Sequence, residues 1–249
     1  MKKVASTRKE WKKAGVRYQI PHIRKVFIRK PAVLKLLGNI RGKKIVDLGC
    51  GDGYYSRFFA KNKAQVTGID FSPTSIAIAE HLEKKEKLGI KYFHADIAHL
   101  PFLKNESFDI ALAEMVLVTI PTQKKLRAIV KEVKRIIRKN GILVISKGHP
   151  TAFFDRTTEF YKWSFDNPKT SYFDSLSPQR VKMNIAGKMI KFTNYHRTLE
   201  DFLRPWLNEG FVVSDIREPK PNKFSIKRFP HHLDTKIPYF IIFKLQKQK

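Results

Sequence analysis

The residues with the clearest capacity for chemistry form a glycine-rich turn directly after an apolar run. Residues 44–48 (Lys-Ile-Val-Asp-Leu) have the composition of a buried strand and lead into Gly49-Cys50-Gly51-Asp52-Gly53. Glycines let a backbone turn sharply and let a ligand come close to it. A strand that enters such a turn and continues into a helix is typical of a nucleotide-binding site.

The spacing of these glycines narrows the kind of ligand. A dinucleotide fold requires Gly-x-Gly-x-x-Gly, but Tyr54 occupies the third position of that spacing. The Gly-Lys-Ser/Thr of a phosphate-binding P-loop is absent. Asp52 in the turn would repel a pyrophosphate, whereas the same carboxylate suits a ligand that carries an ammonium and a sulfonium cation.

Alternating β and α patterns set the fold that must position this turn. Further strands are expected at residues 64–70, 90–94, 108–114, 142–146, 211–215 and 239–245. Helices are expected from Ser72-Pro73 to about Lys87, over the apolar stripe that Asn140-Gly141 closes, and from about Thr198 to Asn208. This alternation predicts an α/β, doubly wound, mostly parallel sheet with helices on both faces.

The motif Val46-Asp47-Leu48-Gly49-Cys50-Gly51-Asp52-Gly53 resembles the first motif of class I S-adenosylmethionine-dependent methyltransferases. Gly68-Ile69-Asp70 resembles their second-strand motif, Ala95-Asp96-Ile97 their adenine motif, and Phe108 to Val116 their fourth-strand motif. The resemblance implies a seven-stranded, Rossmann-like sheet and S-adenosyl-L-methionine as cofactor, with S-adenosyl-L-homocysteine as product.

The resemblance also implies the residues of the cofactor site. Asp70 would bind the ribose hydroxyls, Asp96 would contact adenine, and Glu114 and Met115 would close the methionine side. The expected cofactor-binding residues are Asp47, Gly49, Cys50, Gly51, Asp70, Phe71, Asp96, Ile97, Glu114, Met115 and, from the segment before the first motif, Tyr18.

The C-terminal half is similar to the ubiquinone/menaquinone-biosynthesis-like (methyltransferase type 11) small-molecule branch. There a His-Pro pair, here His149-Pro150, ends the fifth strand, and a segment like Tyr195 to Leu199 opens a later helix. His149 is the first candidate for a general base and His196 the second, although either can equally be a hydrogen-bonded loop histidine. The Asn/Asp-Pro-Pro-Tyr/Phe marker of base-amine methylation is absent, because Glu114-Met115-Val116-Leu117 stands there.

Charge is the unusual feature of the composition. The chain carries 50 Lys+Arg against 22 Asp+Glu, a formal net charge of +28, and half of that excess lies in residues 1–44.

Residues 1–42 are interpreted as a basic, mainly helical extension over the cofactor site, and residues 43–249 as the methyltransferase domain. Residues 150–197, rich in aromatic side chains, are expected to form a substrate lid. The alternative for the extension is an arm that binds RNA or another polyanion.

The remaining composition excludes several classes. Of the 249 residues 42% are hydrophobic, which suits a globular protein, and Cys50 is the only cysteine, so neither an internal disulfide nor a cysteine-rich zinc site is possible. We expect no metal, no signal peptide and no membrane span, and hence a cytoplasmic protein.

Three functions therefore stand after the sequence is read. The first is methyl transfer to an oxygen, nitrogen or carbon atom of a small-molecule acceptor, possible substrates being anionic or aromatic. The second is methylation of RNA or protein through the basic surface. The third is a cofactor-binding, RNA-associated protein without catalysis. The acceptor, the methylated atom and the oligomeric state stay open at this point.

Overall fold

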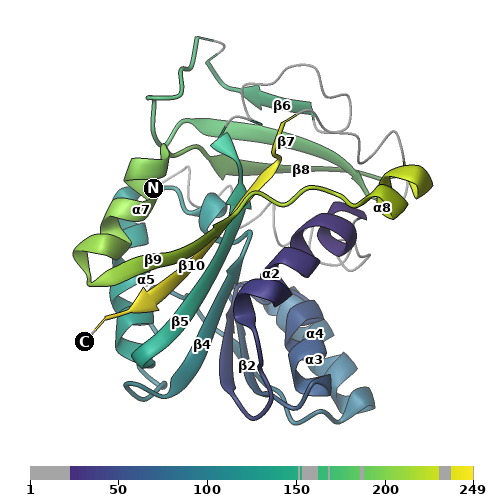
Figure 1. The fold of residues 1–249 in the computed structure, drawn as a ribbon, viewed down its shortest axis with the longest axis vertical. Coiled ribbons are helices and arrows are strands. Elements are labelled where there is room, and N and C mark those ends of the chain that lie inside the picture. Colours follow the sequence, from purple (N-terminus) through teal and green to yellow (C-terminus); the bar gives the residue numbers. More distant parts are fainter. Residues whose placement is uncertain are drawn as a thin grey trace.

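The computed structural model describes residues 23–150, 152, 162–167, 169–185, 188–229 and 237–248. Its main element is a seven-stranded sheet in the order β3-β2-β1-β4-β5-β10-β9 (Figure 1). The strands of this sheet are β1 (Lys44–Leu48), β2 (Gln65–Asp70), β3 (Lys91–His94), β4 (Phe108–Glu114), β5 (Ile137–Gly148), β9 (Phe211–Arg217) and β10 (Phe240–Lys247).

The direction of the strands confirms the predicted fold class. Strands β1 to β5 pair in parallel, and only β10 runs antiparallel to its neighbours β5 and β9. The chain builds outward from β1 through β2 to β3 and then returns to the other side of β1 with β4. Ligands of open α/β sheets bind at such a reversal, at the carboxyl ends of the strands.

Helices cover both faces of this sheet (Figure 1). One face packs on α2 (Lys30–Leu37) and α3 (Tyr54–Lys61), and the other packs on α5 (Gln123–Ile136) and α7 (Leu199–Asn208). The helix α4 (Pro73–Glu86) contacts β2 and β3. Ser72 caps α4, since its side chain accepts a hydrogen bond from the Ser75 amide at 3.3 Å, in agreement with the predicted start of this helix.

The boundary between α5 and β5 differs from the prediction. The helix ends at Ile136 rather than at Asn140-Gly141, and β5 already begins at Ile137. Ile137 is fully buried and pairs with Phe108 of β4, whereas the next paired residues are Ile110 and Ile142. The extra residues form an irregularity in which Asn140 takes a φ of +61°. Burial of an apolar side chain and a strand pairing thus outweigh the helical period.

The predicted insertion contains a second sheet that the sequence did not reveal. It has three antiparallel strands, β6 (Lys162–Phe165), β7 (Pro178–Ile185) and β8 (Lys188–Tyr195), and it lies across the carboxyl edge of the large sheet (Figure 1). This sheet was not predicted, because the many aromatic side chains obscured the two-residue period of its strands. The short helix α8 (Lys223–Arg228) was not predicted either.

The first described residues are helical. A π-helical turn, η1 (Lys25–Arg29), continues into α2, and a short 3₁₀ turn, η2 (Leu117–Thr119), follows β4. In the part of the chain that the structure describes, no helix combines the length and the apolar character needed to cross a membrane.

Lys147, near the end of β5, is a buried cation inside the core. Its Nζ donates to the Arg197 carbonyl at 3.3 Å and lies 4.6 Å from the Phe202 ring centroid, and the side chain has no carboxylate partner among the described residues. Burial, and to a smaller extent Arg197, lowers the pKa of Lys147 to about 7.

This burial predicts a stability effect with a defined sign. Between pH 7 and the ordinary lysine pKa the unfolded chain holds a proton that the folded chain lacks, so Lys147 makes the free energy of unfolding rise with pH, by at most about 1.4 kcal/mol per pH unit. We expect Lys147→Met to be more stable than the wild type at pH 7, with an advantage that shrinks toward pH 10. Chemical denaturation at each pH measures it, with the exposed Lys131→Met as control. An advantage that does not change with pH would contradict the assignment.

Candidate functional site

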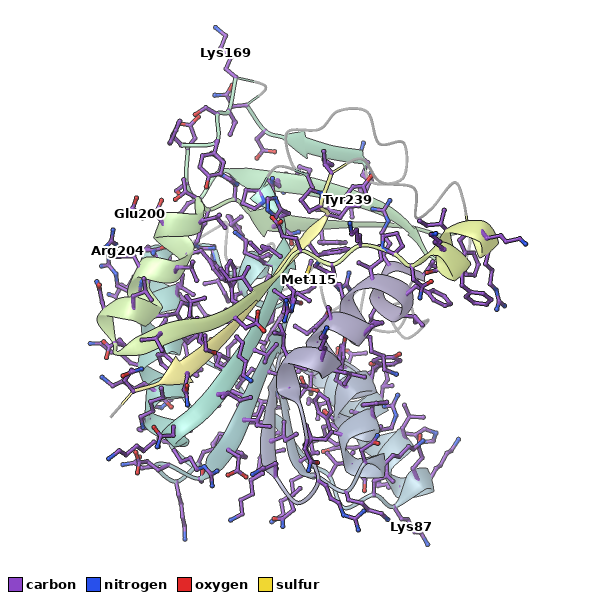
Figure 2. All side chains as sticks on the ribbon, in the orientation of Figure 1. Lys87, Met115, Lys169, Glu200, Arg204 and Tyr239 are labelled. Atoms are coloured by element: carbon purple, nitrogen blue, oxygen red, sulfur yellow. The ribbon has the colours of Figure 1, made fainter. Side chains whose placement is uncertain are left out.

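An open hollow of about 1130 Å³ lies at the carboxyl edge of the large sheet, where the predicted motifs meet. The main hollow, as we call it, is bounded by the turn after β1, the end of β2, the end of β4, the η1 turn, β8 and the start of β10. Met115 lies below the second sheet, at the centre of this junction (Figure 2). The main hollow therefore lies at the reversal point of the large sheet, and the second sheet forms its roof.

The glycine turn has a geometry that requires glycine. Gly49 has a φ of +71°, and a Cβ at this position would lie 2.5 Å from Val116 Cγ2. The amides of Gly49 and Cys50 both donate to the Ile69 carbonyl, at 2.7 and 3.0 Å. The turn is thus folded tightly against the end of β2, which brings the backbone to the wall of the main hollow.

Asp70 joins the end of β2 to the glycine turn. One carboxylate oxygen accepts from the Gly51 amide at 2.9 Å and the other from the Ser72 amide at 2.8 Å. Burial raises the pKa of Asp70, while the two amides oppose that shift. Its side chain lines the main hollow with oxygens that can accept further hydrogen bonds.

Two more carboxyl groups line the hollow near α3. Asp47 accepts from the Ser56 hydroxyl at 2.6 Å, and burial raises the pKa of Asp47 to about 7. Asp52 accepts from the Tyr54 amide at 3.2 Å, and burial raises its pKa as well. Buried carboxyl groups of this kind favour a cationic partner.

The cations of the hollow come from the η1 turn. Arg29 forms an ion pair with Glu114, at 2.6 Å between Nε and Oε1, with side chains only 5% and 11% exposed. Lys25 lies 4.2 Å from the Tyr54 ring centroid, and burial lowers the pKa of Lys25. Lys25 and Tyr55 both line the hollow, and the buried Tyr55 hydroxyl has no hydrogen-bond partner in the described part of the chain.

A smaller side hollow of about 520 Å³ opens next to the main hollow and shares four of its lining residues, among them Gly49 and Phe71. Its walls include Asp96, Ile97, Ile120 and Pro121. Asp96 receives the Lys125 ammonium at 2.6 Å and the Ala98 amide at 3.1 Å. The two hollows together form one cleft along the strand ends.

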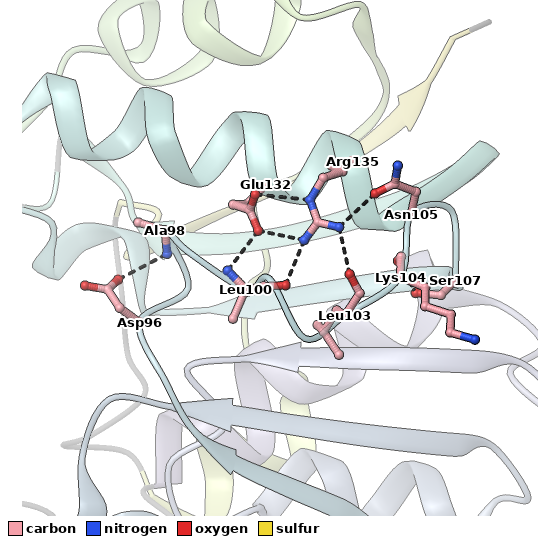
Figure 3. Close-up of polar contacts among 9 residues, drawn as sticks. All are labelled: Asp96, Ala98, Leu100, Leu103, Lys104, Asn105, Ser107, Glu132 and Arg135. Atoms are coloured by element: carbon pink, nitrogen blue, oxygen red, sulfur yellow. Dashed lines mark hydrogen bonds and ion pairs between the residues drawn. The ribbon is translucent and has the colours of Figure 1, made fainter.

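Arg135 of α5 fixes the loop that follows Asp96 (Figure 3). Its guanidinium donates to the Leu100 and Leu103 carbonyls, at 2.8 and 2.7 Å, and pairs with Glu132. Glu132 in turn accepts from the Leu100 amide at 2.9 Å. Because the loop backbone is anchored at several points, the position of the side hollow is set by α5.

The structure brings together the residues that the sequence assigned to the cofactor. Those that line the main hollow are Asp47, Gly49, Cys50, Gly51, Asp70, Phe71, Glu114 and Met115, and those that line the side hollow include Asp96 and Ile97. Tyr18 lies outside the described residues. Among the residues that the structure describes, no three His, Cys, Asp or Glu side chains are grouped to hold a metal ion.

The two histidines suggested as bases occupy different positions. Neither His149 nor His196 is among the residues that line either hollow. His149 Nε2 lies 2.8 Å from Glu218 Oε1, and His196 Nε2 donates to the Tyr172 carbonyl at 2.7 Å. Burial lowers the pKa of both imidazoles. Each imidazole is thus held by a polar contact, and the assignment of either histidine as a general base stays a prediction.

Several lining residues were missed by the sequence prediction. They are Lys25, Arg29, Tyr55, Phe192, Asn194 and Phe240. Lys25 and Arg29 had a partial signal, because they flank the apolar run Val26-Phe27-Ile28 at a spacing that places both cations on one side of a helix. Phe192 and Asn194 could not, because their strand was not predicted.

The sequence of this chain is similar to those of known methyltransferases. The family model described as a methyltransferase domain matches residues 46–145. The chain is 27% identical to the demethylmenaquinone methyltransferase of Lactococcus lactis, over 68% of this chain and 63% of the relative. It is 30% identical to the malonyl-[acyl-carrier protein] O-methyltransferase of Hamiltonella defensa, over 46% of this chain and 41% of the relative.

The fold is shared with solved structures. A S-adenosylmethionine-dependent methyltransferase of Listeria monocytogenes superposes with a TM-score of 0.68 at 23% identity, over 88% of this chain and 96% of that chain. The superposed part of this chain is longer than residues 46–145, which the family model matches. Residues 46–145 therefore carry a methyltransferase domain, within a fold that this chain shares with solved S-adenosylmethionine-dependent methyltransferases.

Proposed function

We propose that this methyltransferase transfers the methyl group of S-adenosylmethionine to a small-molecule acceptor that enters the main hollow beneath β8. The observation that carries the proposal is the single cleft formed by the two hollows at the reversal of the sheet. This cleft extends from Asp96 past Gly49 to the space beside Met115, along the strand ends where open α/β sheets bind nucleosides.

The charges and shapes of the cleft match the parts of the cofactor. The side hollow offers the apolar Ile97 and Ile120 to a planar base and the Asp96 carboxylate to an exocyclic amine. Asp70 offers carboxylate oxygens to vicinal ribose hydroxyls. Near α3, buried carboxyl groups and the cation of Lys25 suit an ammonium and a carboxylate, the two charges of a methionyl group.

The walls of the acceptor side are apolar and covered, which favours a small molecule as the acceptor. Beyond the glycine turn the main hollow is bounded by the apolar side chains Met115, Val118, Phe192 and Phe240. The second sheet lies over this space, and we propose that the insertion of residues 150–197 acts as its lid and residues 1–42 as its side cover. Lys25 and Arg29 of that cover face the hollow rather than an outer surface. The relatives act on different acceptors, as their names state.

Methyl transfer requires the protein mainly to position the two reactants. The cofactor supplies a methyl group on a sulfonium and leaves as a neutral thioether, so an in-line displacement needs alignment above all. The chain holds the acceptor, excludes water with Phe192 and Phe240, and neutralises Glu114 with Arg29. Proximity of this kind accounts for several kcal/mol of a barrier, on the order of 7–11 in favourable cases.

Transfer of labelled methyl from S-adenosylmethionine into an extract of the source cells tests the acceptor. After incubation with purified protein, the extract is separated into small-molecule, RNA and protein fractions. We expect the label in the small-molecule fraction, and we expect no label with heat-inactivated protein. Label in RNA or in protein would overturn the proposed acceptor and would assign a role to the +28 charge.

A further inference from the structure

Two carboxamides of the second sheet are buried at neighbouring positions, Asn194 at the wall of the main hollow and Gln179 beside it in the register of the strands. Gln179 of β7 and Asn194 of β8 are direct partners in the antiparallel register, so their side chains lie on the same face of the sheet. Their relative exposures are 1% and 2%, and Asn194 lines the main hollow. The next pair along the same face, Val181 and Phe192, is apolar and buried.

Three polar side-chain atoms of this pair are unsatisfied. Gln179 Nε2, Gln179 Oε1 and Asn194 Oδ1 are buried without a hydrogen-bond partner among the residues that the structure describes. On the opposite face of the same hairpin, Arg180 pairs with Asp166 and donates to the Thr193 hydroxyl at 2.8 Å. Buried polar atoms are nearly always paired in folded proteins, because an unpaired one lowers stability.

We propose that Gln179 and Asn194 form a hydrogen-bonding subsite for the methyl acceptor, a neutral, largely apolar small molecule that carries an O–H or N–H group. The inference rests on the proposed function and adds the class of acceptor. Two carboxamide oxygens can accept from such a group, and the amide of Gln179 can donate to its oxygen or nitrogen. The subsite carries no charge, and the walls beside it are Phe192, Phe240 and Met115. The charges of Arg29 and Glu114 in this hollow neutralise each other in an ion pair, so this pair does not call for a charged acceptor.

Phenol and toluene are suitable probes, since they share one ring and differ in carrying an O–H group or a methyl group of similar size. Each is titrated into protein saturated with S-adenosylhomocysteine, and binding is followed by nuclear magnetic resonance. The quantity compared is the ratio of phenol affinity to toluene affinity in each protein. We expect this ratio to fall at least about tenfold in Asn194→Leu and in Gln179→Met, because both substitutions keep a side chain of similar length and remove its hydrogen-bonding groups.

Stability gives an independent readout. Replacing an unsatisfied carboxamide by an apolar side chain is expected to leave the melting temperature unchanged or to raise it. Lys191→Met, an exposed position on β8, is the matched control and is expected to change neither the ratio nor the melting temperature. An unchanged phenol-to-toluene ratio in the Gln179→Met/Asn194→Leu double variant would overturn the proposal, and so would equal affinities of the wild type and that variant for phenol.

The failure of this inference can be told apart from failure of the proposed function. Affinity for S-adenosylhomocysteine is measured on the same variants and is expected to stay within about threefold of wild type, since the subsite lies on the acceptor side. If cofactor binding persists and the phenol ratio does not move, only the subsite is refuted. If no protein binds S-adenosylhomocysteine, the proposed function fails first.

Discussion

Replacement of Asp70 by alanine is expected to abolish measurable methyl transfer and to weaken S-adenosylhomocysteine binding on the order of a thousandfold. The carboxylate would lose its hydrogen bonds to two ribose hydroxyls, each worth about 1.5–3 kcal/mol when the acceptor is charged. The substitution also removes the acceptor of the Gly51 and Ser72 amides, which hold the glycine turn. Calorimetric titration with S-adenosylhomocysteine measures the effect.

A control variant and a second ligand separate the loss of cofactor binding from a general effect of the substitution. Asp215→Ala, on β9 and paired with Arg217 at the surface, removes an acid of the same type outside the cleft and is expected to bind the cofactor like wild type. Asp70→Ala is also expected to retain any affinity for RNA, because the positive charge is unchanged. Methyl transfer that survives Asp70→Ala would show that the site assignment is wrong.

Replacement of Arg29 by leucine is expected to destabilise the protein by about 3–5 kcal/mol and to eliminate activity. The substitution leaves the Glu114 carboxylate in a nearly dry position without its ion-pair partner, and uncompensated buried charges have costs of this size. The guanidinium also lies 4.5 Å from the Phe240 ring centroid, so its removal loosens the wall of the main hollow. Denaturant unfolding measures the loss.

The partner and a surface pair serve as controls. Combining Arg29→Leu with Glu114→Gln is expected to recover part of the stability, because the uncompensated charge is then absent. Arg204 and Glu200 form an exposed pair on the outer side of α7 (Figure 2), and Arg204→Leu is expected to cost at most about 0.5 kcal/mol. If Arg29→Leu costs no more than Arg204→Leu, then Glu114 is not held by this pair.

The order of the fold was predictable because local signals agree with the tertiary structure between residues 44 and 136. The strand before Gly49, the cap at Ser72 and the apolar stripe of α5 each have a pattern that burial then reinforces. The same agreement extended to the site, since residues at consecutive strand ends must meet at one edge of a parallel sheet.

The parts that could not be predicted depend on contacts between distant segments. The start of β5 at Ile137 is decided by its pairing with Phe108, and a helical pattern cannot show that pairing. Asn194 reaches the main hollow only because β8 pairs with β7 above the edge of the other sheet. The contacts of His149 with Glu218 and of His196 with Tyr172 likewise join segments far apart in the sequence, so the sequence could not show them, and the assignment of either histidine as a base stays a prediction.

The most direct test of the account is the crystal structure of the S-adenosylhomocysteine complex. The predicted result places adenine in the side hollow at Asp96, the ribose hydroxyls on Asp70, and the methionyl group between Gly49 and Lys25, with the thioether sulfur facing the space under Asn194. Binding of S-adenosylhomocysteine anywhere else, or with its sulfur turned away from the space under β8, would contradict the account.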